Sequence, residues 1–174
     1  MLGLKRDKVS LVPHDDAWES AYRDTENELR AILGGNIIEV RHVGSTSIKG
    51  IAAKPILDVA VVIKDVDALK ADMEATDYEY RGECGVAGRH LLVRRINGDI
   101  STHHIHCYLE NNNDYISVVL FCKYLSEHPE YAKQYNDLKI ELASKFPDDR
   151  VAYGDAKAAF IENIIAMAKS ENCA

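Results

Sequence analysis

The residues best suited to chemistry are a small polar loop and a carboxylate that follows it. The loop is Gly44-Ser45-Thr46-Ser47, and twelve residues separate Ser45 from Asp58. Glycine lets a backbone approach a ligand closely, while hydroxyls and the N–H groups that open a short helix favour anions. Asp58 is the only charge in the apolar run 56–63. A carboxylate in such surroundings has to be paired, hydrogen-bonded or bound to a metal. Together these groups suggest metal-assisted chemistry on a nucleotide.

Two predicted strands flank the loop and carry the carboxylate. β-Branched residues at 37–43 indicate a strand that ends at the loop, and the apolar run 56–63 is typical of a strand covered on both faces. The loop therefore lies between one strand and a second, buried strand that bears Asp58. The same residues also fit a simpler interpretation, in which the loop is a tight turn and Asp58 is a structural carboxylate that holds backbone amides.

The order of these groups resembles the signature of the nucleotidyltransferase (polymerase β-like) superfamily, and nearly the whole chain resembles the GrpB family. The segments that carry the resemblance are HVGSTS at 42–47, GIAAKPILDV at 50–59, GECGVAGR at 82–89, HHIH at 103–106, YAKQYNDLK at 131–139, and Tyr153 with Lys157 and Phe160-Ile161.

This resemblance implies an α/β (α+β) fold of the nucleotidyltransferase type, with a mixed β-sheet flanked by helices and a helical C-terminal part. It also implies a divalent metal (Mg, Mn or Zn) as cofactor and a nucleoside triphosphate as substrate. The superfamily places a second Asp or Glu two residues after the first, but this chain has Ala60 there. The usual site of two carboxylates is therefore incomplete.

A histidine-rich segment offers groups that can complete the site. Residues 99–110 alternate as a strand does, which places Ile105 and Cys107 on one face and His104 and His106 on the other. In the nucleotidyltransferase fold a later strand lies beside the one that bears the first carboxylate. The resemblance thus implies that the two histidines are metal ligands or a general base. Imidazoles favour Zn²⁺ or Mn²⁺ over Mg²⁺. A solvated sheet face is the alternative.

Three charged residues elsewhere are candidates for the same site. Glu83 can supply the missing carboxylate as a metal ligand, Arg89 can hold phosphate oxygens through two parallel hydrogen bonds, and Lys54 can contact a triphosphate. The alternative for Glu83 and Arg89 is a glycine-rich hairpin with a surface ion pair, and Lys54 can simply be solvated.

A tyrosine and a lysine near the end of the chain are the last candidates. Tyr153 and Lys157 are four residues apart on one predicted helix and face the same way. The resemblance implies that the tyrosine contacts the base or ribose and that the lysine contacts phosphate. An ordinary surface pair is the alternative.

The remaining sequence predicts a scaffold around these groups. We expect one domain over residues 1–174, with a sheet-rich core at about 1–112 and a helical C-terminal part at about 113–174. Apolar spacing in the second part is broken near Pro129 and Pro147. In the first part it predicts helices over 18–33, ending at Gly34-Gly35, and over 65–76, and strands over 78–81 and 89–96.

Composition limits the class of protein. The chain has 174 residues, of which 47% are hydrophobic and 28% charged, as in a folded domain with its own core. No apolar run reaches the length that spans a bilayer, and the N-terminal residues lack the apolar region of a signal peptide, so we expect a cytoplasmic protein without a membrane partner. Absence of CxxC spacing favours reduced thiols. The cysteines are Cys84, Cys107, Cys122 and Cys173.

A net charge of -7 argues against a broad nucleic-acid surface and favours a small nucleotide as the partner. Three functions remain open. The first is a nucleotidyltransferase that transfers a nucleoside monophosphate to an acceptor. The second is a catalytically degenerate module that binds a nucleotide or another metabolite. The third is a phosphoesterase that uses a transition metal on the Asp and His side chains.

Overall fold

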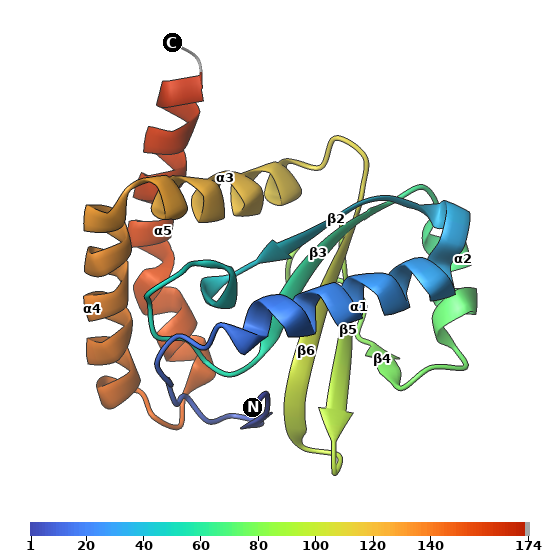
Figure 1. Ribbon diagram of the computed structural model, residues 1–174, viewed down its shortest axis with the longest axis horizontal. Coiled ribbons are helices and arrows are strands. Elements are labelled where there is room, and N and C mark those ends of the chain that lie inside the picture. Colours follow the sequence, from blue (N-terminus) through green and yellow to red (C-terminus); the bar gives the residue numbers. More distant parts are fainter. Residues whose placement is uncertain (173–174) are drawn as a thin grey trace.

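A mixed β-sheet lies at the centre of the structure, a computed structural model that describes residues 1–172 (Figure 1). Cys173 lies outside the described residues. The strands are β1 (Leu4–Lys5), β2 (Ile37–Val43), β3 (Leu57–Ile63), β4 (Tyr78–Tyr80), β5 (Arg89–Ile96) and β6 (Ile100–Leu109). Their order is β2-β3-β6-β5-β4, and the short β1 pairs with β6. The pair β3 and β6 is parallel, and the other pairs are antiparallel.

Two groups of helices flank the sheet (Figure 1). The first group packs on one face and consists of α1 (Ala17–Leu33) and α2 (Val66–Met73). The second group packs beside the opposite face and consists of α3 (Asn113–Glu127), α4 (Pro129–Lys145) and α5 (Arg150–Asn172). Short 3-10 turns, η1 (Gly34–Asn36) and η2 (Ser45–Ser47), stand before and after β2.

The buried strand β3 separates two hydrophobic cores. Because successive side chains of a strand point to opposite faces, Val59 and Val61 pack with Leu29 of α1, whereas Ala60 packs with Phe121 of α3. Val59, Ala60 and Val61 are all fully buried. The prediction of a strand covered on both faces is confirmed.

The predicted helices over 18–33 and 65–76 begin within one residue of the expected positions, but α2 ends at Met73, three residues before residue 76. Gly34 ends α1 with a φ of 48°, a conformation that glycine adopts without strain. The side chain of Asp65 accepts a hydrogen bond from the Ala68 N–H and so caps α2, which leads from β3 to β4. Pro129 stands in the first turn of α4, where its missing N–H costs no helical hydrogen bond.

The mixed sheet and the flanking helices confirm the predicted fold class. The last strand ends at Leu109 and α3 begins at Asn113. That the chain forms a single domain stays a prediction. Within residues 1–172, no helix is both long enough and apolar enough to cross a membrane.

Candidate functional site

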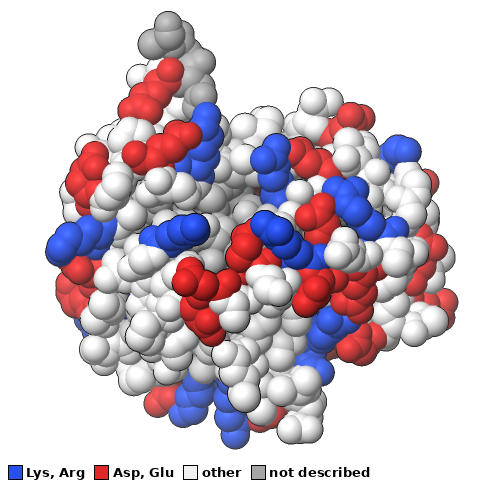
Figure 2. Space-filling model, viewed as in Figure 1, with Lys and Arg blue, Asp and Glu red and all other residues white. Residues whose placement is uncertain are grey.

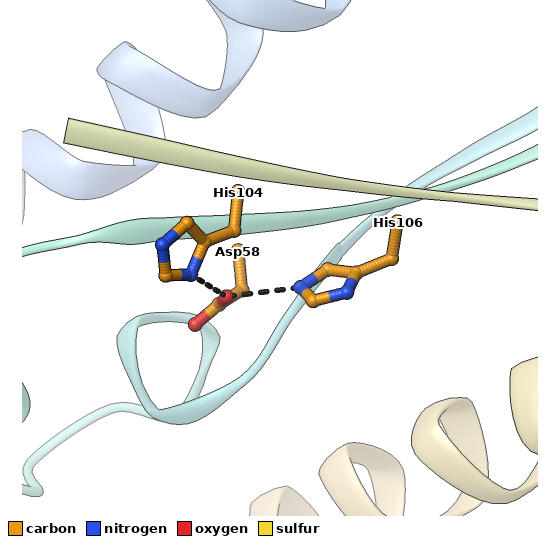
Figure 3. Close-up of side chains that lie close together, drawn as sticks. All are labelled: Asp58, His104 and His106. Carbon is orange, nitrogen blue, oxygen red and sulfur yellow. Dashed lines mark hydrogen bonds and ion pairs between the residues drawn. The ribbon is translucent and has the colours of Figure 1, made fainter. Parts of the chain in front are cut away.

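The parallel pairing of β3 and β6 brings Asp58 together with two histidines. Asp58 is directly opposite His104, and Ala60 is opposite His106. Both imidazoles point toward the carboxylate (Figure 3), with His104 Nδ1 at 3.3 Å and His106 Nε2 at 3.1 Å from the same oxygen, Asp58 Oδ1. One potential ligand atom from each of the three residues lies within 4.8 Å of the others. This arrangement fits a single divalent ion.

The carboxylate is held in its charged form. Burial by itself raises the pKa of Asp58, but the hydrogen bonds and charges of His104 and His106 outweigh it and hold the pKa well below its usual range. The side chains are partly open to solvent, with exposed fractions of 30% for Asp58, 22% for His104 and 18% for His106. A charged carboxylate that solvent can reach is suited to bind a cation.

The polar loop lies directly against this carboxylate. Gly44 has a φ of 71°, and a Cβ atom added there would lie 2.8 Å from Asp58 Oδ2, so only glycine fits without displacement. Ser47 Oγ donates to the Gly44 carbonyl oxygen at 2.7 Å. The buried Thr46 hydroxyl lies 3.0 Å from Nε2 of His42, which stacks on Tyr22. The side chains around the loop therefore hold its backbone beside Asp58.

The loop and Asp58 form one wall of a cavity of 240 Å³ beneath the C-terminal helices. Three lysines line this cavity: Lys54 before β3, Lys139 of α4 and Lys157 of α5. The remaining lining residues are Gly44, Ser45, Thr46, Ile56, Asp58, Val118, Phe121, Cys122, Tyr135, Tyr153, Ile161 and Ile165. On the face drawn in Figure 2, acidic and basic side chains are interspersed. The cavity differs from that surface because it gathers positive charges.

Burial disfavours the protonated, charged form of each of the three lysines. Burial is the main cause that lowers the pKa of each lysine. The pKa of Lys139 falls to about 7, because the charges of Lys157 and Lys54 add to the effect of burial. The pKa of Lys157 falls to about 8. The pKa of Lys54 is also lowered, although Asp58 offsets part of the effect. Among the described residues, none of the three forms an ion pair with a carboxylate. An anion bound in the cavity would compensate these charges.

Sequence reasoning named Lys54 and Lys157 but missed Lys139. This side chain is 1% exposed and its Nζ donates to the Ala52 carbonyl oxygen. A signal was present, because Tyr135, Lys139 and Leu142 have the spacing of one helix face that otherwise packs in the core. A lysine at a core position of that stripe is a candidate for a buried charge.

Tyr153 lies in the cavity wall between two of the lysines. It is 1% exposed, and burial raises the pKa of its hydroxyl to about 12. Lys157 Nζ lies 4.3 Å and Lys54 Nζ 5.5 Å from the centre of its ring. Tyr153 is therefore not a surface residue, and both Tyr153 and Lys157 line the cavity.

The structure does not bring Glu83 and Arg89 into this group. Glu83 accepts a hydrogen bond from the Gly88 N–H within the turn that joins β4 and β5, and Arg89 donates to the carbonyl oxygens of Glu83 and Cys84. In the part of the chain that the structure describes, the metal-ligand group contains Asp58 and the two histidines alone.

The fold is of the nucleotidyltransferase type. The structure of the Cid1 poly(U) polymerase with MgGTP bound is similar, with a TM-score of 0.51 and 14% sequence identity over 76% of this chain and 44% of that chain. At this identity the likeness concerns the fold alone.

The chain belongs to the GrpB family, whose model, described as GrpB protein, matches residues 8–167. The crystal structure of the conserved protein GrpB from Enterococcus faecalis has a TM-score of 0.85 and 35% identity, covering 95% of this chain and 100% of that chain. UPF0157 protein YqkA of Bacillus subtilis is 34% identical over 165 residues, or 93% of this chain. The chain spans about half the length of YqkA, at 48%. The family resemblance noted in the sequence is confirmed.

Proposed function

We propose that this protein binds a nucleoside triphosphate in the lysine-lined cavity and transfers its nucleotidyl group to an acceptor. The observation that carries the proposal is the convergence of Asp58, His104 and His106 beside the loop that begins at Gly44. The similarity of the fold to a polymerase with MgGTP bound supports the choice of ligand.

The residues of the loop and the cavity would bind the phosphates. Ser45 and Thr46 offer hydroxyls and backbone N–H groups at the start of η2, and Lys54, Lys139 and Lys157 offer ammonium groups in the lining of the same cavity. Hydrogen bonds from charged donors to phosphate are stronger than those from neutral donors. Positioning of the triphosphate is the main contribution to nucleotidyl transfer, because little covalent chemistry falls to the protein.

Asp58, His104 and His106 would hold the metal. A divalent ion held by these residues would neutralise charge that develops on the transferred phosphate. One carboxylate and two imidazoles form a donor set that suits Zn²⁺ or Mn²⁺ better than Mg²⁺. In the reaction the acceptor oxygen bonds to the α-phosphorus, the bond from that phosphorus to the bridging oxygen breaks, and pyrophosphate leaves with the electron pair. Where only one of His104 and His106 is a ligand, the other imidazole would accept the proton of the acceptor hydroxyl.

A second candidate function is binding without catalysis. Ala60, where the superfamily has a carboxylate, is fully buried and packs in the core beside Phe121. A second carboxylate at this position would have to displace apolar contacts. Such a protein would hold the nucleotide as a sensor or accessory module.

The experiment measures the melting temperature and the release of pyrophosphate together, for each nucleoside triphosphate with Mg²⁺, Mn²⁺ or Zn²⁺. Wild type should be stabilised by nucleotide and should release pyrophosphate only with metal. Asp58→Asn, which keeps the side-chain shape, should reduce release by at least about 100-fold, the scale of losing one group that stabilises the transition state. Asp67→Asn is the matched control, because Asp67 is 93% exposed on α2.

Each other outcome selects a different function. Stabilisation without any release would contradict transfer and support the binding module. Release of inorganic phosphate with Mn²⁺ or Zn²⁺ and no acceptor would instead support a phosphoesterase. The absence of any nucleotide effect would refute both nucleotide functions.

A further inference from the structure

The cavity has two chemically different ends along α5. Tyr153, Lys157, Ile161 and Ile165 follow one another at intervals of four residues, so they lie on one face of the helix. At a rise of about 1.5 Å per residue, Ile165 lies roughly 12 Å along the helix from Lys157. One face of α5 therefore lines the cavity along its length, with Lys157 at a cationic end and Ile165 at an apolar end.

The cationic end requires an anion. Lys54 and Lys157 both lie near the ring of Tyr153, and the charges of Lys54 and Lys157 act on Lys139. A diphosphate ester is multiply charged near neutral pH, and its negative charges would favour the protonated forms of Lys139 and Lys157. This end is thus complementary to a diphosphate group.

Apolar side chains dominate the cavity lining toward Ile165. It is lined by Val118 and Phe121 of α3 and by Ile161 and Ile165 of α5, which pack in the same hydrophobic cluster. None of these side chains can donate or accept a hydrogen bond. The edges of a nucleobase buried here would lose their hydrogen bonds to water without replacement, which is unfavourable, whereas an aliphatic group would gain from burial.

The volume of the cavity also favours a small occupant. At 240 Å³ it lies below the roughly 300–1,000 Å³ of pockets that enclose drug-sized ligands. A complete nucleoside triphosphate would leave its base outside the cavity. A diphosphate with a short chain would place both of its parts inside.

We propose, building on the anion site of the proposed function, that the cavity binds an alkyl diphosphate whose phosphates contact Lys54, Lys139 and Lys157 and whose short aliphatic chain lies against Ile161 and Ile165. The chain length that fits is a few carbons. The same lysines would then serve two ligand classes, which compete for the cavity.

Calorimetric titration of the full chain without divalent metal tests the proposal, with methyl diphosphate, pentyl diphosphate and ATP as ligands. Each buried methylene strengthens binding by about fourfold. Pentyl diphosphate should therefore bind at least about tenfold more tightly than methyl diphosphate, and its binding should show the more negative heat-capacity change of apolar burial. This comparison uses wild-type protein and needs no variant to fold.

Two variants test the apolar end and the cationic end of the cavity separately. Ile161→Thr keeps the branch at Cβ but replaces the ethyl arm with a hydroxyl, so it should remove most of the pentyl advantage and leave methyl diphosphate binding within about twofold of wild type. Lys157→Met should weaken both ligands by a similar factor. A melting temperature near that of wild type establishes that each variant is folded.

The outcomes distinguish this proposal from the proposed function. Equal affinity for the methyl and pentyl compounds would overturn the apolar site, even if ATP binds and supports the nucleotide function. Preference for the pentyl compound, with no ATP binding either without metal or after addition of Mn²⁺, would support the alkyl site and contradict the nucleotide function. Failure of all three ligands to bind, both without and with Mn²⁺, would overturn both.

Discussion

Replacement of Lys139 with methionine tests whether a buried ammonium is held in the cavity. The lysine side chain is 1% exposed and donates to the Ala52 carbonyl oxygen. Burial first, and then the charges of Lys157 and Lys54, lower its pKa from 10.5 to about 7. Methionine has a similar length and no charge, so the variant removes this cost together with the hydrogen bond.

The sign of the effect follows from proton linkage. Below pH 7 the lysine is protonated in both states, and the cost of its burial is present in full. Between pH 7 and 10.5 the unfolded chain binds a proton that the folded chain lacks, so wild-type stability rises with pH by up to about 1.4 kcal/mol per unit. The complete shift corresponds to a cost on the order of 5 kcal/mol below pH 7.

The lost hydrogen bond acts in the opposite direction. An unsatisfied carbonyl at Ala52 costs about 1–3 kcal/mol at any pH. Lys139→Met should therefore be more stable than wild type at pH 6 by roughly 2 kcal/mol, the remainder after the lost hydrogen bond. By pH 9 this advantage should fall by about 2 kcal/mol or more.

Urea unfolding at pH 6, 7, 8 and 9 measures the difference. Lys133→Met is the matched control, because Lys133 lies on the same helix but is 76% exposed and pairs with Asp137. Its effect should stay within about 0.5 kcal/mol at every pH. A difference between Lys139→Met and wild type that does not change from pH 6 to 9 would refute the reasoning.

Three further predictions concern the loop, the metal and the anion. Gly44→Ala should lower the free energy of unfolding in urea by about 1–3 kcal/mol, because Gly44 has a positive φ and an added Cβ would contact Asp58. Gly35→Ala is the control, since a Cβ added at Gly35 meets nothing within 4 Å. Equal effects of the two substitutions would contradict this prediction. His106→Gln should weaken Zn²⁺ binding in calorimetry by at least about tenfold, and unchanged affinity would exclude it as a ligand. Tripolyphosphate should bind several-fold more weakly at pH 9 than at pH 7, because Lys157, with a pKa of about 8, loses its proton. In Lys157→Met the affinity for tripolyphosphate should depend less on pH.

Much of the fold could be predicted because local patterns decided it. The helix stop at Gly34, the cap at Asp65 and the break at Pro129 depend on neighbouring backbone groups, which the sequence places in order. The alternation in β6 likewise predicted that His104 and His106 share a face, since strand periodicity needs no tertiary contact.

The candidate site was predictable only where a resemblance supplied the long-range pairing. That Asp58 would stand beside His104 depended on β3 and β6 being neighbours, which the order of similar segments implied and spacing alone could not. Glu83 was expected near the metal for its charge, but the turn uses its carboxylate to accept from Gly88 N–H. A local hydrogen bond within a turn forms at little entropic cost, and so competes well with a distant site.

By itself the sequence determined the elements, the polar loop and the single charge of β3, because each follows from contacts between residues close in the chain. Tertiary structure alone decided that Lys54, Lys139 and Lys157 line one cavity and that its far end is apolar. These residues come from a loop and two helices separated by long stretches of chain. Their burial and mutual repulsion depend on how α4 and α5 pack against the sheet, which no local pattern specifies.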